Sequence, residues 1–236
     1  MASSYPGALD TLTNPVGTDY QDTVDHAAQH TNANDAIEAI ETELGIDPAG
    51  TYTDLVTRLN ADDTVGWDAD ALNYKAMNYD PMLCTTQTAL TTNGTVYVQK
   101  LWVPVGTLTN IVVVVGTAGA TLTAGQNFAG LYDDSKNSVR FTADQSTPWV
   151  STGLKTMALT STYSNTVARY MYVVLWANGT TRPAFSRSPG NNAALNGALS
   201  AANARWASAD TGRTTTGPAT LGAFTATTNP YWVAIS

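Results

Sequence analysis

The clearest repeating pattern in the chain lies between His26 and Leu44, where apolar positions recur in alternating steps of three and four residues. With His30 at heptad position a, the a and d positions of this seam are His26, His30, Ala33, Ile37, Ile40 and Leu44. This spacing predicts a short coiled coil, and isoleucine at both a and d favours trimers over dimers. The alternative is an amphipathic helix that packs on its own domain, because the seam covers only about three heptads.

Signals on both sides of the seam extend the prediction to a helical coiled-coil stalk over residues 18–60. Thr18 and Gln21 form a capping box, which places the start of the long helix just after Thr18. Gly45 is suited to the left-handed position that follows the last turn of a helix. A second capping box at residues 51–54 opens a short helix, which we expect to fold against the first.

Residues 1–17 form a predicted anchoring arm ahead of the stalk. Tyr5, Leu9 and Leu12 are poor residues for a solvent-facing segment, and no helical pattern accounts for their burial. We expect them to pack on a neighbouring chain or on a larger assembly. The alternative is a disordered tail, which is the usual state of chain termini.

From about residue 85 the hydrophobic period changes from the helical spacing to two. Alternating or continuously apolar segments at 95–103, 108–115, 154–159 and 169–176 predict strands, and Asn178-Gly179 is a hairpin signal with 182–185 as its second strand. About eight to ten short strands with frequent turns are typical of an antiparallel sandwich. The sequence therefore predicts a jelly-roll-like head over residues 86–236, mainly β, joined to the stalk by a connector over residues 61–85.

Charge divides the chain into two regions with different compositions. Residues 1–82 hold fifteen Asp and Glu against two Lys and Arg, whereas residues 83–236 hold four against nine. The basic residues of the second region are scattered, so no nucleic-acid partner is expected. The longest strongly apolar run, 111–115, is too short to enter a bilayer as a spanning helix, and the start of the chain lacks a signal-peptide pattern. Cys84 is the only cysteine, which excludes an internal disulfide.

Several short segments of the sequence resemble those of a known class of proteins. They are Tyr5-Pro-Gly-Ala-Leu-Asp, His26-x-x-x-His30-x-x-x-Asn34-Asp-Ala-Ile, Phe128-Ala-Gly-Leu-Tyr-Asp, Thr142-Ala-Asp-Gln-Ser-Thr-x-Trp149, Ser151-Thr-Gly-Leu-Lys-Thr156 and Tyr172-Val-Val-Leu-Trp-Ala-Asn-Gly179. The chain in this respect resembles minor tail, fibre and capsid-surface appendage proteins of tailed bacteriophages. The resemblance implies a homotrimer that displays its C-terminal domain outward, and it implies no catalytic residues.

Candidate chemistry in the chain is sparse. His26 and His30 are the only histidines, and a trimer would stack them as two rings that either hold a metal ion or form hydrogen bonds within the seam. We favour the second reading, so neither a metal nor another cofactor is expected. The head has no histidine, which excludes a Ser-His-Asp site within it, and its few carboxylates lie in predicted turns. We therefore expect no enzymatic activity.

Tryptophan is the residue type in the head most suited to ligand contact. Trp149, Trp176 and Trp206 are candidates for stacking on a host-surface glycan, although tryptophans more often fill a core or a subunit interface. The sequence as a whole predicts a virion structural protein. It would be a homotrimeric fibre or capsid-decoration appendage that attaches to other virion proteins through its N-terminal arm and has no membrane insertion. The alternative is a receptor-binding or glycan-binding protein of a tail fibre or tail tip.

Overall fold

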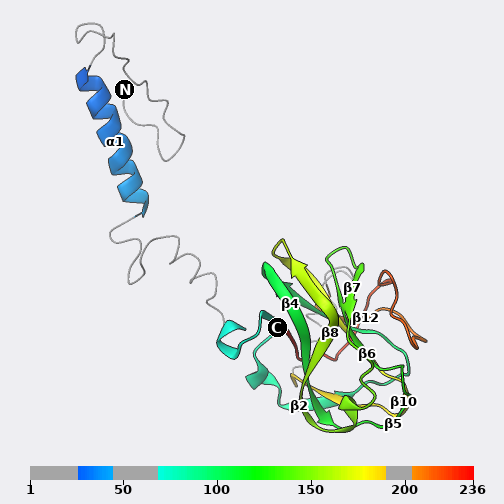
Figure 1. Ribbon diagram of the computed structural model, residues 1–236. Coiled ribbons are helices and arrows are strands. Elements are labelled where there is room, and N and C mark those ends of the chain that lie inside the picture. Colours follow the sequence, from blue (N-terminus) through cyan, green and yellow to red (C-terminus); the bar gives the residue numbers. More distant parts are fainter. Residues whose placement is uncertain (1–25, 45–68, 190–203) are drawn as a thin grey trace. The chain divides into compact units, whose positions relative to one another are not determined.

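A computed structural model describes residues 26–44, 69–189 and 204–236 of the chain (Figure 1). The chain divides into two compact units, Met1–Val65 and Gly66–Ser236, which are described separately. The predicted arm over residues 1–17, the predicted start of the long helix and the predicted second helix of the stalk lie outside the described residues.

Helix α1 is the described element of the first unit and spans His26–Leu44. Its sequence is rich in alanine and glutamate, two of the better helix formers, and contains neither glycine nor proline. Within it, the hydroxyl of Thr42 donates a hydrogen bond to the carbonyl of Glu38 one turn earlier, at 2.7 Å. This bond satisfies the side chain locally, so Thr42 is compatible with the helical conformation.

The second unit is built from two antiparallel six-stranded sheets. The first sheet has the order β1-β14-β4-β11-β2, with β8 also pairing β4, and consists of β1 (Ala76–Met77), β2 (Thr86–Ala89), β4 (Gly106–Thr117), β8 (Gly153–Asn165), β11 (Ala184–Arg187) and β14 (Val233–Ile235). The second sheet has the order β13-β12-β3-β9-β6-β7, with β3 (Tyr97–Val103), β6 (Phe128–Tyr132), β7 (Ser138–Phe141), β9 (Arg169–Trp176), β12 (Trp206–Ser208) and β13 (Thr225–Ala226).

Shorter elements also lie among the described residues of the unit. Strands β5 (Ala120–Leu122) and β10 (Gly179–Thr181) form a separate two-stranded sheet, and the described 3₁₀ turns are η1 (Asp70–Leu72), η2 (Pro81–Leu83) and η3 (Pro148–Val150). The prediction of a mainly β, antiparallel architecture is confirmed by these sheets.

Alternation along the strands produces a core between the two sheets. On β9, Met171, Val173 and Leu175 belong to the cluster that also contains Ile111 and Val113 of β4 in the other sheet. Their neighbours on β9 point to the opposite face, because successive side chains of a strand alternate. The main core is therefore shared by both sheets.

Two further clusters cover the opposite faces of the sheets. On the second sheet, Tyr172 and Trp176 pack with Leu221 and Phe224 from the segment that follows β12. On the first sheet, the side chains of Val112 and Trp232 are covered by aromatic and apolar residues that precede β2. Both sheets thus bury side chains on two faces, so their strands are more continuously apolar than in a sandwich with one solvated face.

The segment before β2 belongs to the β unit. Strand β1 pairs antiparallel with β14, with Ala76 opposite Ile235, and Tyr74, Met77 and Tyr79 pack around Trp232. The predicted connector over residues 61–85 is to this extent wrong, since its described residues 69–85 belong to the β unit, with β1 in the first sheet and the rest packed against it. Its aromatic residues are the physical reason, because they bury against an apolar sheet face.

The predicted hairpin at Asn178-Gly179 is also wrong. The chain leaves β9 in the second sheet, pairs with β5 through β10, and continues as β11 in the first sheet. The side chain of Asn178 holds this crossing in place by donating hydrogen bonds to the carbonyls of Gln126 and Arg213, at 3.0 and 2.8 Å. These tertiary bonds replace the local turn that an Asn-Gly pair usually forms.

Candidate functional site

An exposed apolar stripe runs along α1. The side chains of Ile37, Ile40 and Leu44 are 54, 43 and 46% exposed, and Ala33 is half-buried. Residues three and four apart lie on one face of a helix, so the three large side chains are neighbours. Of the two histidines, His30 is exposed, whereas the side chain of His26 lies outside the description. A stripe of this kind is stabilised when a partner surface covers it.

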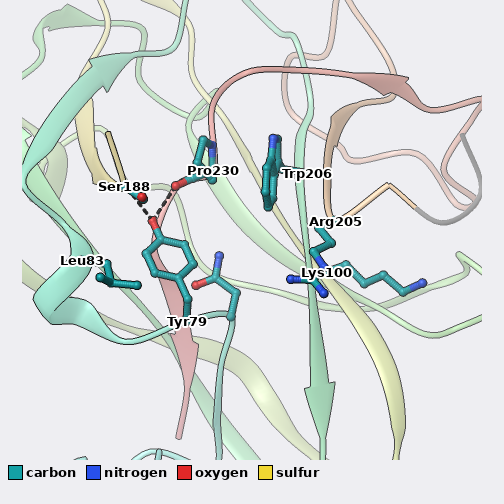
Figure 2. A pocket seen from close by; sticks show the side chains of 8 residues that line it. Tyr79, Leu83, Lys100, Ser188, Arg205, Trp206 and Pro230 are labelled. Atoms are coloured by element: carbon teal, nitrogen blue, oxygen red, sulfur yellow. Dashed lines mark hydrogen bonds between the residues drawn. The ribbon is translucent and has the colours of Figure 1, made fainter. Parts of the chain in front are cut away.

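A pocket of about 200 Å³ lies in the β unit, where segments from distant parts of the sequence meet. It is lined by Asn78, Tyr79, Leu83, Lys100, Ser188, Arg205, Trp206 and Pro230. Figure 2 shows the indole of Trp206 on one side and the ring of Tyr79 on the other. The guanidinium of Arg205 lies below the indole, while the side chain of Lys100 points away from the pocket.

Hydrogen bonds hold the Tyr79 side of the pocket in one conformation. The Tyr79 hydroxyl donates to the carbonyl of Pro230 at 2.5 Å and accepts from the backbone N–H of Ser188 at 3.0 Å. The carbonyl of Tyr79 accepts from the indole N–H of Trp232 at 2.9 Å. Burial raises the pKa of Tyr79, and the neighbouring thiol of Cys84 adds to the effect, so this hydroxyl stays neutral.

Asn78 supports the same side of the pocket. Its Nδ2 donates to the carbonyl of Tyr231 at 2.7 Å, and its Oδ1 accepts from the backbone N–H of Val233 at 3.1 Å. On the other side, Trp206 begins β12, which pairs with β3 so that Trp206 lies opposite Gln99. The carbonyl of Arg205 accepts from the backbone N–H of Lys100 at 2.7 Å, which extends this pairing by one residue. The Tyr79 wall is therefore held by side-chain hydrogen bonds, and the Trp206 wall by backbone pairing.

The charge of the pocket lining is positive. Among the described residues that line the pocket, Lys100 and Arg205 are cations and none is acidic. Partial burial lowers the pKa of Lys100, whose ammonium nitrogen lies 4.6 Å from the centroid of the Tyr170 ring.

A second aromatic surface was not anticipated from the sequence. Trp102 of β3 and Tyr170 of β9 are 53 and 51% exposed, and they are opposite each other in the strand register. Their ring centroids are 5.1 Å apart in an edge-to-face arrangement. The available signal is that Trp102 occupies the polar phase of an alternating strand, between the buried residues Leu101 and Val103.

The structure separates the three tryptophans that were predicted to face a ligand. Trp206 is half-buried and lines the pocket, whereas Trp149 and Trp176 are fully buried. The prediction is wrong for these two, because rings without accessible surface cannot stack on a ligand. The Trp149 indole N–H contacts the Met157 sulfur at 3.3 Å, and Trp176 donates to the carbonyl of Thr214 at 3.2 Å.

The four carboxylates of the predicted head act as local structural groups. Asp133 accepts from the backbone N–H of Asn137 at 2.8 Å, and Asp134 forms an ion pair with Arg169 at 3.3 Å. Asp210 forms an ion pair with Arg213 at 3.0 Å.

Asp144, the fourth carboxylate, caps a loop. It accepts hydrogen bonds from the hydroxyl of Ser146 and from backbone amides, including that of Asn127 at 3.0 Å. Burial raises its pKa, but these hydrogen bonds outweigh burial and leave the pKa below its usual range. The group is therefore ionised at neutral pH. Within residues 26–44, 69–189 and 204–236, no three His, Cys, Asp or Glu residues gather as a metal site.

Cys84 lies beside the pocket wall, with its sulfur 3.9 Å from the Tyr79 hydroxyl oxygen. Burial raises the pKa of this thiol. At neutral pH the group is therefore a thiol, which is a poor nucleophile compared with a thiolate.

Comparison with known proteins identifies no relative. No protein-family model, no curated protein and no solved structure matches the chain. Among the described helices, none combines the length and apolar character needed to cross a bilayer.

Proposed function

We propose that this protein is a structural component of a bacteriophage virion, a homotrimeric surface appendage of the fibre or capsid-decoration type. In this proposal three copies of α1 form a short coiled coil, the N-terminal region attaches the trimer to other virion proteins, and a jelly-roll-like β head is displayed outward. The observation that carries it is the exposure of Ile37, Ile40 and Leu44 along one face of α1.

The energetics of the stripe support association of the helices. Complete burial of an isoleucine or leucine side chain stabilises a protein by about 1.5–3 kcal/mol relative to full exposure. Each chain would contribute three side chains of which about half is still accessible, so a trimer would bury nine. Ile37 at a and Ile40 at d are the combination that favours three strands rather than two. The N-terminal segments that begin at Tyr5 and His26 resemble those of phage appendage proteins, which supports the same arrangement.

Measurement of molar mass tests the oligomeric state. Light scattering of the full chain should give three times the chain mass of 24.9 kDa. Ile37→Asp should give a lower mass, because the trimer would bury three carboxylates without partners. Glu38→Gln is the matched control, since Glu38 is an exposed neighbour outside the predicted seam and should leave the mass unchanged. A monomeric native protein at micromolar concentration would contradict the proposal.

Deletion of residues 2–16 tests the direction of attachment. The shortened chain should remain a soluble trimer, because the helix and the β unit are intact, but it should no longer join the virion. The measurement is its occupancy on purified particles relative to the full-length protein. Incorporation at full occupancy would show that another region makes the docking contacts.

The second candidate function is receptor or glycan binding by a tail fibre or tail tip protein. The exposed pair Trp102 and Tyr170 favours it, since half-exposed aromatic rings are costly to leave in water and suited to stacking. Replacing both by alanine should then reduce adsorption of particles to host cells while the protein remains folded. Unchanged adsorption would contradict receptor binding by this pair, and the structural role would then be the only proposed function.

A further inference from the structure

The outer face of the second sheet places a lysine beside two exposed aromatic rings. Lys100 and Trp102 are two residues apart on β3, so their side chains point to the same face of the sheet. Tyr170 of β9 lies opposite Trp102 in the strand register, and about half of each ring is accessible. These three residues are called the aromatic–lysine surface below.

Contacts with aromatic rings hold the Lys100 ammonium over this surface. Its nitrogen lies 4.6 Å from the centroid of the Tyr170 ring and 5.9 Å from the centroid of the Tyr172 ring. Ring faces attract a cation at such distances. Figure 2 shows the same side chain directed away from the pocket beside Trp206. The positive charge of Lys100 therefore belongs to the aromatic–lysine surface rather than to the pocket.

No acidic side chain neutralises Lys100 among the described residues. The ion pairs within that part of the chain join Arg169 to Asp134 and Arg213 to Asp210. Burial lowers the pKa of Lys100, and no neighbouring carboxylate opposes this effect. A partly desolvated cation without a counter-charge is stabilised when an anion approaches it. The charge of the surface thus complements an anionic ligand.

The two rings of the surface favour a ligand with an apolar ring face. Trp102 and Tyr170 meet at an interplanar angle of 75°, so each ring offers its own face rather than part of one flat platform. The C–H face of a pyranose packs well on such a ring. Residues two apart on a strand are separated by about 7 Å. One sugar ring with an anionic substituent can span that distance, from Trp102 to the ammonium of Lys100.

We propose that the aromatic–lysine surface binds a pyranose ring that carries an anionic group, as in an acidic polysaccharide. The ring packs on Trp102 and Tyr170, and the anionic group pairs with the ammonium of Lys100. Lysine acts as a point charge, so either a carboxylate or a phosphate can fill this role. The proposal rests on the second candidate function and names the class of glycan that these two rings would take.

Fluorine NMR of the full chain labelled with 5-fluorotryptophan tests this site. The chain has six tryptophans, and the Trp102→Phe variant identifies the Trp102 signal by its loss. Sodium glucuronate and glucose 6-phosphate should shift that signal in a saturable manner, whereas glucose at the same concentrations should shift it far less. A response to both anions supports the shared chemistry. A response to one of them also supports the proposal and assigns the anionic group as carboxylate or phosphate.

Charge removal supplies the second arm of the experiment. Lys100→Gln should raise the dissociation constant for the anionic sugar about three- to tenfold, because a charge-assisted hydrogen bond is lost. Lys75→Gln is the matched control, since Lys75 is exposed just before β1 of the other sheet and its loss changes the net charge equally. The other five tryptophan signals report whether each variant is folded.

Three results would overturn the proposal. They are the absence of any shift of the Trp102 signal with either anionic sugar, an equal shift with glucose, and a Lys100→Gln variant that binds as tightly as the Lys75→Gln control.

The adsorption of particles separates this proposal from the function on which it rests. If the double alanine variant of Trp102 and Tyr170 loses adsorption while the native protein shows no preference for anionic sugars, receptor binding stands and the anionic ligand is wrong. If anionic sugars bind while adsorption of the variant is unchanged, the ligand is supported and a role of this surface in host attachment is contradicted.

Discussion

Gly94 occupies a backbone position that other residues do not fit. Its φ is +65°, in the left-handed region, and a Cβ built on it would lie 2.4 Å from the backbone nitrogen of Arg213. The Gly94 N–H donates to the carbonyl of Ala177 at 3.1 Å, and its carbonyl accepts from Arg213 N–H at 3.0 Å. The residue therefore joins two loops at a distance that excludes any side chain.

Replacement of this glycine should be costly. Gly94→Ala should lower the free energy of unfolding by more than about 2 kcal/mol, because the left-handed conformation alone costs about 1–2 kcal/mol and the backbone must also move. Gly125→Ala is the matched control, with φ of +73° and no atom within 4 Å of its Cβ, so only the conformational cost applies. Denaturant unfolding measures both, and equal losses would contradict the close contact.

Tryptophans provide a second comparison at the residue scale. Trp149 is fully buried and packs edge-to-face on Phe185 at 5.1 Å, whereas half of Trp102 is exposed. Trp149→Ala should cost about 3–5 kcal/mol, the usual cost of truncating a buried aromatic residue. Trp102→Ala should cost clearly less, since less apolar area is returned to water. Thermal unfolding of the two variants compares these stability losses. A larger loss for Trp102→Ala than for Trp149→Ala would contradict the burial seen in the structure.

At the scale of elements, β1 and the turn that follows it determine where the β unit begins. These residues pair with β14 and cover Trp232, and the Tyr79 hydroxyl donates to the Pro230 carbonyl across 151 residues of sequence. A boundary at residue 86, as predicted from the change of hydrophobic period, would remove this cover. Strand pairing rather than sequence periodicity therefore sets the edge of the unit.

Two truncations test this boundary. A chain of residues 66–236 should fold with a melting temperature close to that of the β unit in the full protein. A chain of residues 86–236 should melt at a lower temperature or fail to fold, because Trp232 and the outer face of β14 would be exposed to water. Circular dichroism melts of the two chains measure the difference. Equal melting temperatures would show that the segment before β2 contributes no stability.

At the scale of the whole molecule, buried tyrosines make stability depend on alkaline pH. Burial raises the pKa of Tyr79, Tyr132 and Tyr231 in the folded protein, whereas an unfolded chain releases these protons near pH 10. Above that pH the folded state binds more protons than the unfolded state. The contribution of these residues to stability is therefore complete below about pH 10 and is lost as pH rises further.

Denaturant unfolding between neutral pH and pH 11 should show this decline. Each such tyrosine contributes a slope of about 1.4 kcal/mol per pH unit above the unfolded pKa. Tyr132→Phe should reduce this slope by the contribution of one proton, about 1.4 kcal/mol per pH unit. The variant also loses the hydrogen bond to the carbonyl of Pro218 at 2.7 Å, which lowers its stability at every pH. A slope that is the same in the variant and the native protein would exclude Tyr132 as a contributor.

The sequence by itself determined the elements whose signals are local. Residues 169–176 were predicted as a strand and form β9, and the predicted strand 154–159 lies within β8. Helix α1 spans His26–Leu44, the residues of the heptad seam, while the coiled-coil stalk over residues 18–60 stays a prediction. The strand predictions succeed because side-chain periodicity follows directly from backbone geometry, which is the same wherever the strand is placed.

Only the tertiary structure decided which faces are covered and which residues meet. Trp176 and Trp102 both lie on the face of the second sheet opposite the main core, yet Phe141 and the segment after β12 bury the first and leave the second exposed. The pocket brings Trp206 beside Pro230, and no local pattern encodes that approach. The physical reason is that burial depends on which segments cross a face, and these crossings are set by long-range strand pairing rather than by neighbours in sequence.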